Sequence, residues 1–195
     1  MSQPERDTRL CIVDTAERLF KAIGYQKTTV ADIAKTLRMS PANVYRFFDS
    51  KKSINEAVLE RYKGEQEQAL LAVAGQGGTA SSRLREMLLT VYRLNQARFA
   101  DQQRMQEMVC AAMEESWEAI IAHVERLDGV LKTVVADGIA SGEFQDMDAG
   151  KTTQCLRTAM TRFYHPLVMS QSECMPGPSA EEMVDFLMAA LRKPG

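Results

Sequence analysis

The segment 28–52 constrains the fold of this chain more than any other part of the sequence. It reads TTVADIAKTLRMSPANVYRFFDSKK, and its apolar spacing predicts two short helices joined by a turn of a few residues. Thr29 with Asp32 resembles a capping box, which marks the start of the first helix. Ser40 followed by Pro41 marks the start of the second, since both residue types suit a helix N-terminus. Two short helices with so brief a connection are typical of a helix-turn-helix unit that reads DNA.

The second of these helices carries side chains that suit the edges of bases. Asn43 and Arg46, three positions apart, share one face of the helix. An arginine can bond the O6 and N7 atoms of guanine, and an asparagine can bond the edge of adenine. Pro41 and Ala42 are small and apolar, so they can touch a thymine methyl group. We therefore expect this helix to enter the major groove of double-stranded DNA.

The net charge of −2 conceals a strong asymmetry along the chain. Residues 1–63 carry 12 Lys and Arg against 8 Asp and Glu, a net charge of +4, whereas residues 64–195 carry 12 against 18, a net charge of −6. Within 21–52 there are 7 basic and 2 acidic residues, or +5. Cations concentrated in one segment suit a polyanion, and the acidic remainder of the chain is repelled by it.

Almost every other apolar stretch also has helical spacing, and strand signals are nearly absent. The glycine-rich stretch 75–82 indicates a loop, and Ser179 with Glu182 forms a second capping box. The expected fold class is all-α, with an N-terminal three-helix head, a C-terminal helical bundle and about nine helices in total. Besides the short pair that starts at Thr29 and Ser40, the predicted helices span 8–23, 51–73, 82–99, 102–113, 115–140, 146–169 and a final segment that begins after Ser179.

Cysteine and histidine are too scattered for a metal site or a catalytic constellation. The two histidines, His123 and His165, lie far apart, and no cysteine lies within four residues of another. Catalysis needs a nucleophile with its base and orienting group, or a metal cluster. We therefore predict that the chain is not an enzyme and has no metal and no cofactor. The four cysteines are Cys11, Cys110, Cys155 and Cys174.

Neither a membrane span nor a signal segment is indicated. No apolar run approaches the roughly 18–20 residues that cross a bilayer. The N-terminal segment 1–8 is polar, with mixed charge and no apolar core. We expect a soluble cytoplasmic protein with no membrane partner.

Several motifs near the N-terminus match a known family in order and spacing. They are Ala16-Glu17-Arg18-Leu19-Phe20, Gly24-Tyr25, Thr28-Thr29-Val30, Ile33-Ala34, Ser40, Tyr45, Phe47-Phe48 and Ser50-Lys51-Lys52. With these residues, the segment 9–60 resembles the TetR family of bacterial transcriptional regulators. Beyond residue 64 the resemblance is one of architecture and length, with GIASGEF at 138–144 looking like the family's turn after its seventh helix.

The resemblance implies a homodimer in which each subunit has a DNA-binding head, 1–62, and a regulatory body, 63–195. It implies a repressor that binds a palindromic operator and is released by a small, often apolar effector bound in the body. Tyr45 looks like the family's phosphate-contacting tyrosine, and Thr29 and Lys51 match positions where helix starts meet the DNA backbone. The full set of expected DNA-binding residues is Thr28, Thr29, Ser40, Pro41, Ala42, Asn43, Tyr45, Arg46 and Lys51.

Methionine and aromatic residues in the body suit a binding site for an apolar molecule between helices. The expected pocket is lined by Met105, Met108, Trp117, Ile121 and Phe163. The last two long helices carry more apolar surface than a monomer needs, which favours a four-helix dimer interface. The expected interface residues are Leu156, Met160, Leu167, Phe186, Leu187 and Ala190.

Two other interpretations stay open at this point. A DNA-binding regulator can respond to oxidation through Cys110 or Cys155, or it can respond to no ligand at all. A helical enzyme is the less favoured interpretation, because a catalytic group would have to be assembled from residues far apart in the sequence.

Overall fold

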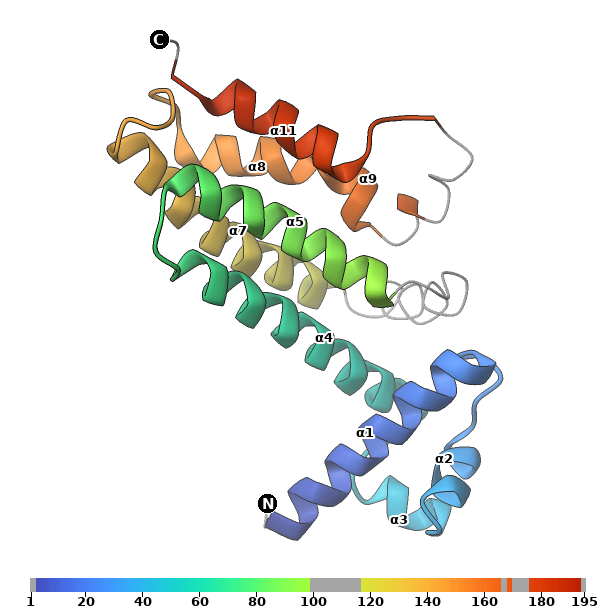
Figure 1. Cartoon of the computed structure of the whole chain (residues 1–195). Coiled ribbons are helices and arrows are strands. Elements are labelled where there is room, and N and C mark those ends of the chain that lie inside the picture. Colours follow the sequence, from blue (N-terminus) through green and yellow to red (C-terminus); the bar gives the residue numbers. More distant parts are fainter. Residues whose placement is uncertain (1–2, 99–116, 166–167, 170–175, 194–195) are drawn as a thin grey trace. The chain divides into compact units, whose positions relative to one another are not determined.

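The structure is a computed structural model that describes residues 3–98, 117–165, 168–169 and 176–193. In these ranges every regular element is an α-helix, and an isolated bridge joins Phe144 to Arg192. The predicted all-α class is confirmed (Figure 1). The helices are α1 (Gln3–Ile23), α2 (Val30–Thr36), α3 (Pro41–Tyr45), α4 (Lys51–Ala74), α5 (Ala80–Arg98), α7 (Trp117–Ala140), α8 (Ala149–Ala159), α9 (Thr161–Tyr164) and α11 (Ala180–Leu191).

The described chain divides into two compact units, each of which we treat by itself. The first, here called the head, comprises residues 3–64. The second, here called the body, comprises the described residues of 65–98 and 118–193. One continuous helix, α4, contributes residues to both units.

The head is built on the apolar stripe of α1. Ile12, Ala16 and Phe20 follow each other four residues apart, so they share one helix face, and all three are fully buried. α2 packs against α1 and buries Ile33 and Ala34 completely. The predicted helical periodicity of both segments is therefore confirmed.

The helix starts follow the sequence closely. Thr29 and Asp32 form the predicted capping box of α2, and Ser179 and Glu182 form that of α11. Two other helix starts were predicted less well. α1 begins at Gln3 instead of residue 8, and α8 begins at Ala149 instead of residue 146. The predicted helix 102–113 lies outside the described residues.

The prediction of one helix over 146–169 is wrong. α8 ends before Met160, and the short α9 follows directly. Met160, at the break, and Phe163, in α9, are both buried in the core of the body. His165, which precedes a proline, is extended with φ −85° and ψ 120°, since that neighbour disfavours the helical region.

The body encloses an apolar core to which α4, α5, α7, α8, α9 and α11 contribute. α11 packs on α5, and α5 also packs on α9 (Figure 1). None of the helices in the described ranges has both the length and the apolar character that crossing a membrane requires. The largest fully buried side chains of the body are Leu70, Leu84, Met87, Leu88, Phe144, Leu156 and Met160.

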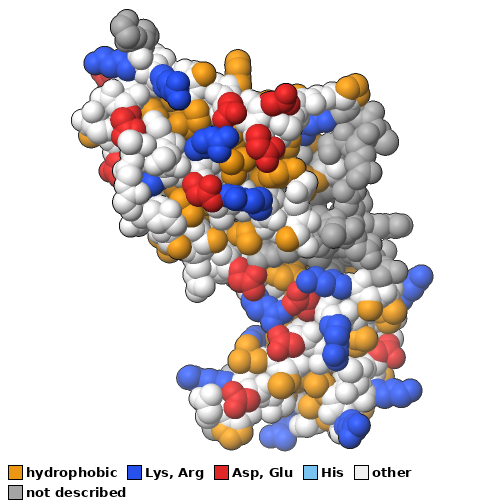
Figure 2. Space-filling view, viewed as in Figure 1, with side chains coloured by type: hydrophobic (Ala, Val, Ile, Leu, Met, Phe, Trp, Pro, Cys, Tyr) orange, Lys and Arg blue, Asp and Glu red, His pale blue; other side chains and the backbone are white. Residues whose placement is uncertain are grey.

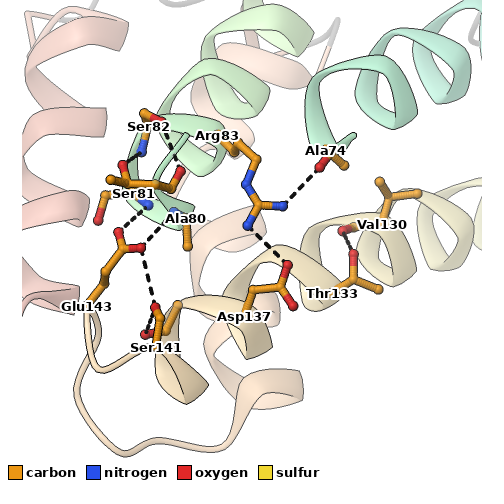
Figure 3. A network of polar contacts seen from close by, with 12 residues as sticks. Ala74, Ala80, Ser81, Ser82, Arg83, Val130, Thr133, Asp137, Ser141 and Glu143 are labelled. Atoms are coloured by element: carbon orange, nitrogen blue, oxygen red, sulfur yellow. Dashed lines mark hydrogen bonds and ion pairs between the residues drawn. The ribbon is translucent and has the colours of Figure 1, made fainter. Parts of the chain in front are cut away.

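A carboxylate from the turn after α7 caps the start of α5 (Figure 3). The Glu143 carboxylate accepts hydrogen bonds from the backbone N–H groups of Ala80 and Ser81, both at 2.9 Å, and from the Ser141 hydroxyl at 3.3 Å. Because a helix N-terminus favours negative charge, these bonds lower the pKa of Glu143 below its ordinary value. The turn is thereby tied to a helix more than sixty residues earlier in the chain.

The residue after this carboxylate joins the same turn to the end of the chain. The ring of Phe144 lies so close to Gly138 that a Cβ there would be 2.2 Å from two ring atoms. The Gln145 backbone N–H then donates to the Leu191 carbonyl at 2.9 Å, which links the turn to α11. Glycine at position 138 is thus required by close approach.

Candidate nucleic-acid interface and regulatory body

α3 has one buried face and one face open to solvent. Val44 is fully buried and Phe48, just beyond the helix, is nearly so. These two apolar side chains, four residues apart, anchor the helix on the head. Arg9 of α1 lies over the Phe48 ring, 4.6 Å from its centroid. The side chains that remain exposed on and just after α3 are Pro41, Ala42, Tyr45 and Arg46.

Two residues of the expected DNA-binding set also build α3 itself. The Ser40 hydroxyl caps the helix by accepting the backbone N–H of Asn43 at 3.2 Å. Asn43 is half-buried, and its side-chain nitrogen lies 3.9 Å from the Met39 sulfur. Its side-chain oxygen accepts a long hydrogen bond from the Arg46 guanidinium at 3.5 Å. Asn43 therefore borders the exposed face and steadies Arg46.

The turn between α2 and α3 contains a strained residue. Arg38 has φ 56°, in the left-handed region that glycine usually occupies. Directly after it, the Met39 backbone N–H donates to the Ala34 carbonyl at 2.9 Å. The reversal allows α3 to pack directly on α2, and no glycine in the sequence announced it.

Thr28 does not lie on the surface. Its side chain is fully buried, and its hydroxyl donates to the Gly24 carbonyl at 2.8 Å. Gly24 itself has φ 95°, which supplies a left-handed cap at the end of α1. Thr28 thus shapes the turn between α1 and α2 and offers no group to DNA, which corrects the expected site.

Thr29 is exposed, but its hydroxyl is engaged in capping α2. That hydroxyl donates to an Asp32 carboxylate oxygen at 2.6 Å and accepts the Asp32 backbone N–H at 3.1 Å. The Thr29 backbone N–H also donates to the carboxylate, at 2.9 Å. These hydrogen bonds from Thr29 lower the pKa of Asp32. A hydrogen bond from Thr29 to a DNA phosphate would therefore compete with its bonds to the Asp32 carboxylate.

Lys51, the first residue of α4, is half-buried and points back to the turn after α1. Its ammonium donates to the carbonyl of Tyr25 at 2.9 Å and to that of Gln26 at 3.4 Å. It also lies 4.3 Å from the centroid of the Tyr25 ring. Burial lowers the pKa of this ammonium from its ordinary value.

Positive charge lies on the outside of the head. Figure 2 shows Lys and Arg side chains around the surface of the unit that contains α1, α2 and α3. Five of the seven basic residues between positions 21 and 52 are exposed, so the segment's excess charge is available to a polyanion. These five are Lys21, Lys27, Lys35, Arg38 and Arg46.

A carboxylate that the sequence did not single out fastens α1 to α4. Glu17 forms ion pairs with Lys21 of its own helix and with Arg61 of α4. It also accepts a hydrogen bond from the Tyr62 hydroxyl. These contacts hold α1 against the first part of α4 within the head.

The expected pocket residues are dispersed in the described part of the body. Phe163 is buried and meets the Tyr92 ring edge-on, with centroids 5.9 Å apart. Ile121 of α7 is instead 43% exposed. Trp117 begins α7, but its side chain lies outside the described residues, as do Met105 and Met108.

Sequence reasoning missed a chain of polar contacts through the body. Gln66 of α4 lies 3.0 Å from a His123 ring nitrogen and donates to the Asn95 side chain at 2.6 Å. Asn95 in turn donates to the Tyr164 carbonyl at 3.1 Å, and the Tyr164 hydroxyl donates to the Leu88 carbonyl at 2.8 Å. Burial raises the pKa of Tyr164 strongly. One signal was available: Asn95 occupies a position of α5 in line with its buried stripe.

The expected dimer residues divide between core and surface. Leu156 and Met160 belong to the body's own core and are at most 2% exposed, which corrects the expected interface. On α11, Phe186 is 70% exposed, Ala190 is exposed and Leu187 is half-buried. Leu167 lies outside the described residues.

The described ranges contain no group of three or more His, Cys, Asp or Glu side chains arranged to hold a metal ion. Cys11 and Cys155 are free and exposed. Cys110 and Cys174 lie outside the described residues.

These features define a class: a helical DNA-binding regulator whose head carries a helix-turn-helix unit. Residues 12–58 match the family model described as bacterial regulatory proteins of the tetR family. Residues 80–181, more than half of the chain, match the model for the tetracyclin repressor-like C-terminal domain. The chain belongs to the TetR family of bacterial transcriptional regulators.

Individual relatives agree with this assignment. The chain is 51% identical over 45 residues, 23% of its own length, to the biofilm operon icaADBC negative transcriptional regulator IcaR of Staphylococcus aureus. It is 30% identical over 81 residues, 42% of its length, to the HTH-type transcriptional regulator YuxN of Bacillus subtilis. The matched segments span 24% and 28% of those relatives.

A solved structure shows the same fold over almost the whole chain. A transcriptional regulator of the TetR/AcrR family from Thermobifida fusca superposes with a TM-score of 0.65 and 24% sequence identity. The match covers 94% of this chain and 95% of that one.

Proposed function

We propose that a homodimer of this regulator binds a palindromic operator by placing α3 in the major groove, and that it represses transcription there. The observation that carries the proposal is the exposed face of α3 on a cationic head, opposite the buried anchor Val44. The printed name of the S. aureus relative, a negative transcriptional regulator, supports repression. Operator binding places its action in the bacterial cytoplasm.

The residues of this face divide between base reading and backbone contact. Arg46 would bond the O6 and N7 atoms of a guanine, and Asn43 an adenine next to it. Pro41 and Ala42 at the helix start would touch thymine methyl groups. Tyr45, which is 50% exposed, would donate its hydroxyl to a phosphate, with Thr29 and Ser40 at the neighbouring helix starts.

Selection of bound sequences from a pool of random duplexes tests this proposal. We expect a motif with two-fold symmetry whose half-sites lie about 34–36 Å apart, or a multiple of that spacing. Arg46→Ala should cost about 1–3 kcal/mol at one base pair and relax the preference there. The matched control is Lys35→Ala, which removes an exposed cation on α2. Equal losses on selected and random duplexes would argue against base reading by Arg46.

The dimer would form through the exposed face of α11. In support, Phe186 and Ala190 are exposed there and Leu187 is half-buried. A partner that covers Phe186 would remove its apolar surface from water, which favours association. Phe186→Asp should therefore yield a monomer in light scattering at micromolar concentration, whereas Glu181→Ala on the same helix should not. A monomeric parent protein would contradict the proposal.

The effector would be a small apolar molecule bound in the body beside Phe163. The edge-on contact of Phe163 with Tyr92 supports an aromatic wall. An effector should quench Trp117 fluorescence and release DNA at the same concentration. The alternative is redox control through Cys110 or exposed Cys155. Peroxide-driven release that a Cys→Ser variant abolishes would favour it.

A further inference from the structure

The Lys51 ammonium has three partners within the head. Two partners are the carbonyl oxygens of Tyr25 and Gln26, at 2.9 and 3.4 Å. The third is the face of the Tyr25 ring, whose centroid is 4.3 Å away. An ammonium has three donors and no acceptor, so this arrangement satisfies it within the head. A phosphate could be bound only by giving up one of these contacts.

The contacts of Lys51 stabilise the turn 24–28, which also has hydrogen bonds of its own. Within the turn, the Thr28 hydroxyl and backbone N–H donate to the Gly24 carbonyl, at 2.8 and 3.2 Å. The Thr28 N–H also lies 3.3 Å from the Tyr25 carbonyl that Lys51 binds. Lys51 adds a tie from a residue 26 positions later. The segment 24–28 is thereby fastened to the start of α4.

Electrostatics favours this placement of the charge. A cation gains nothing at the N-terminus of its own helix, where the helix dipole is positive. The carbonyls of Tyr25 and Gln26 follow directly on the last turn of α1, where the dipole is negative. The side chain of Lys51 therefore carries its charge from an unfavourable helix end to a favourable one.

We propose that Lys51 is a positioning residue for DNA binding and that its ammonium does not bind phosphate. It closes a loop of chain, 25–51, that contains the whole helix-turn-helix unit. α2 and α3 lie between the two points that Lys51 joins, so their orientation depends on this tie. The inference rests on the proposed role of α3 as the reading helix, and it changes the role expected for Lys51 from its place in the family pattern.

The first test compares affinity with its salt dependence, using the duplex that the parent protein enriches. Each phosphate contact contributes about 0.9 to the slope of log K against log salt concentration. Lys51→Met should weaken binding at least about tenfold, because the turn at 25–28 loses its tie to α4. Its slope should equal that of the control Lys35→Met, which removes the same charge from α2. A slope smaller by one further contact, or an affinity equal to the control's, overturns the proposal.

The second test needs no DNA, so its result does not depend on the proposed function. In Lys51→Met, amide hydrogen exchange of residues 25–28 should accelerate at least about tenfold, while the amides of the α1 core stay protected. Unchanged exchange in the turn overturns the positioning role even where DNA binding is lost. A parent protein that enriches no duplex would instead contradict the proposed function, and the exchange result would still decide whether Lys51 holds the turn.

A third arm remains decisive if Lys51→Met does not fold. Tyr25→Leu removes the ring face beside the ammonium, and Tyr25→Phe keeps it. We expect DNA binding to weaken in the leucine variant and to stay near the parent value in the phenylalanine variant. The losses of Tyr25→Leu and the charge-keeping Lys51→Arg should not add in the double variant, because both act on one contact. Fully additive losses overturn the proposal.

Discussion

The exposed face of α3 and the interior of the body use polar side chains in opposite ways. Tyr45 at the end of α3 and Arg46 just after it are exposed, while the buried Val44 holds the helix on the head. The body instead threads polar side chains such as Gln66 and Asn95 between its helices. A surface that must meet a rigid duplex can be built from a short local pattern. A body that holds its helices together through long-range contacts needs side chains from distant parts of the chain.

The independence of the two units is tested most strongly by removing one fully buried phenylalanine ring from each. Phe144→Ala in the body and Phe20→Ala in the head should each lower the free energy of unfolding by about 3–5 kcal/mol. Both rings are at most 2% exposed. Denaturant unfolding followed by circular dichroism measures the loss, and amide exchange assigns it to a unit. Phe20→Ala should also weaken DNA binding, since that ring belongs to the α1 stripe on which the head is built.

A loss of stability confined to one unit in each variant would support separate cores. If Phe144→Ala exposed the amides of α1 and α2 as much as those of α5, the division into head and body would fail as an energetic description.

A glycine substitution in the body tests the close packing at the turn after α7. Gly138→Ala should cost about 1–3 kcal/mol, because the new Cβ overlaps the Phe144 ring and a packed core cannot absorb it. Gly129→Ala on the same helix is the control, since a Cβ there meets no atom within 4 Å. That variant should gain about 1 kcal/mol from helix propensity. Thermal unfolding of both variants distinguishes the effect of close approach from that of helix propensity. Equal shifts in melting temperature would refute the role of close approach at Gly138.

The corresponding change in the head acts on its strained turn. Arg38→Gly should stabilise the head by about 1 kcal/mol, because glycine adopts a φ of 56° without the cost that a side chain incurs. Denaturant unfolding measures the gain. Arg38→Ala is the control for the lost side chain, and it should give no such gain. If both variants behaved alike, the left-handed conformation would not be a source of strain.

The limits of sequence reasoning have the same origin in both units. Ser40 and the capping box of Thr29 were predictable because a cap forms between residues three apart. The break at Met160 was not, since no side-chain cap marks the start of α9 there. The contacts of Lys51 and Gln66 were not either, because their partners lie 25 to 57 positions away along the chain.

The smallest expected effect concerns pH and the Glu143 carboxylate in the body. Hydrogen bonds from the start of α5 lower its folded-state pKa below the ordinary value of 4.5. A group with a lowered pKa stabilises the fold above its unfolded pKa, and this contribution is lost as pH falls through the folded pKa. Glu143→Gln should therefore be less stable than the parent at pH 7, and the difference should shrink below pH 4.5. Thermal unfolding between pH 7 and pH 3.5 measures both curves.

The control carboxylate for this experiment lies in the same unit. Asp137 pairs with Arg83 near the same helix start, and its side chain is 56% exposed (Figure 3). An exposed ion pair contributes at most about 1 kcal/mol and is screened by salt. Asp137→Asn should lose its small effect in high salt, whereas the effect of Glu143→Gln should persist, because backbone N–H groups of α5 are fixed donors. Equal salt sensitivity would show that Glu143 acts only as a surface charge and not as a cap.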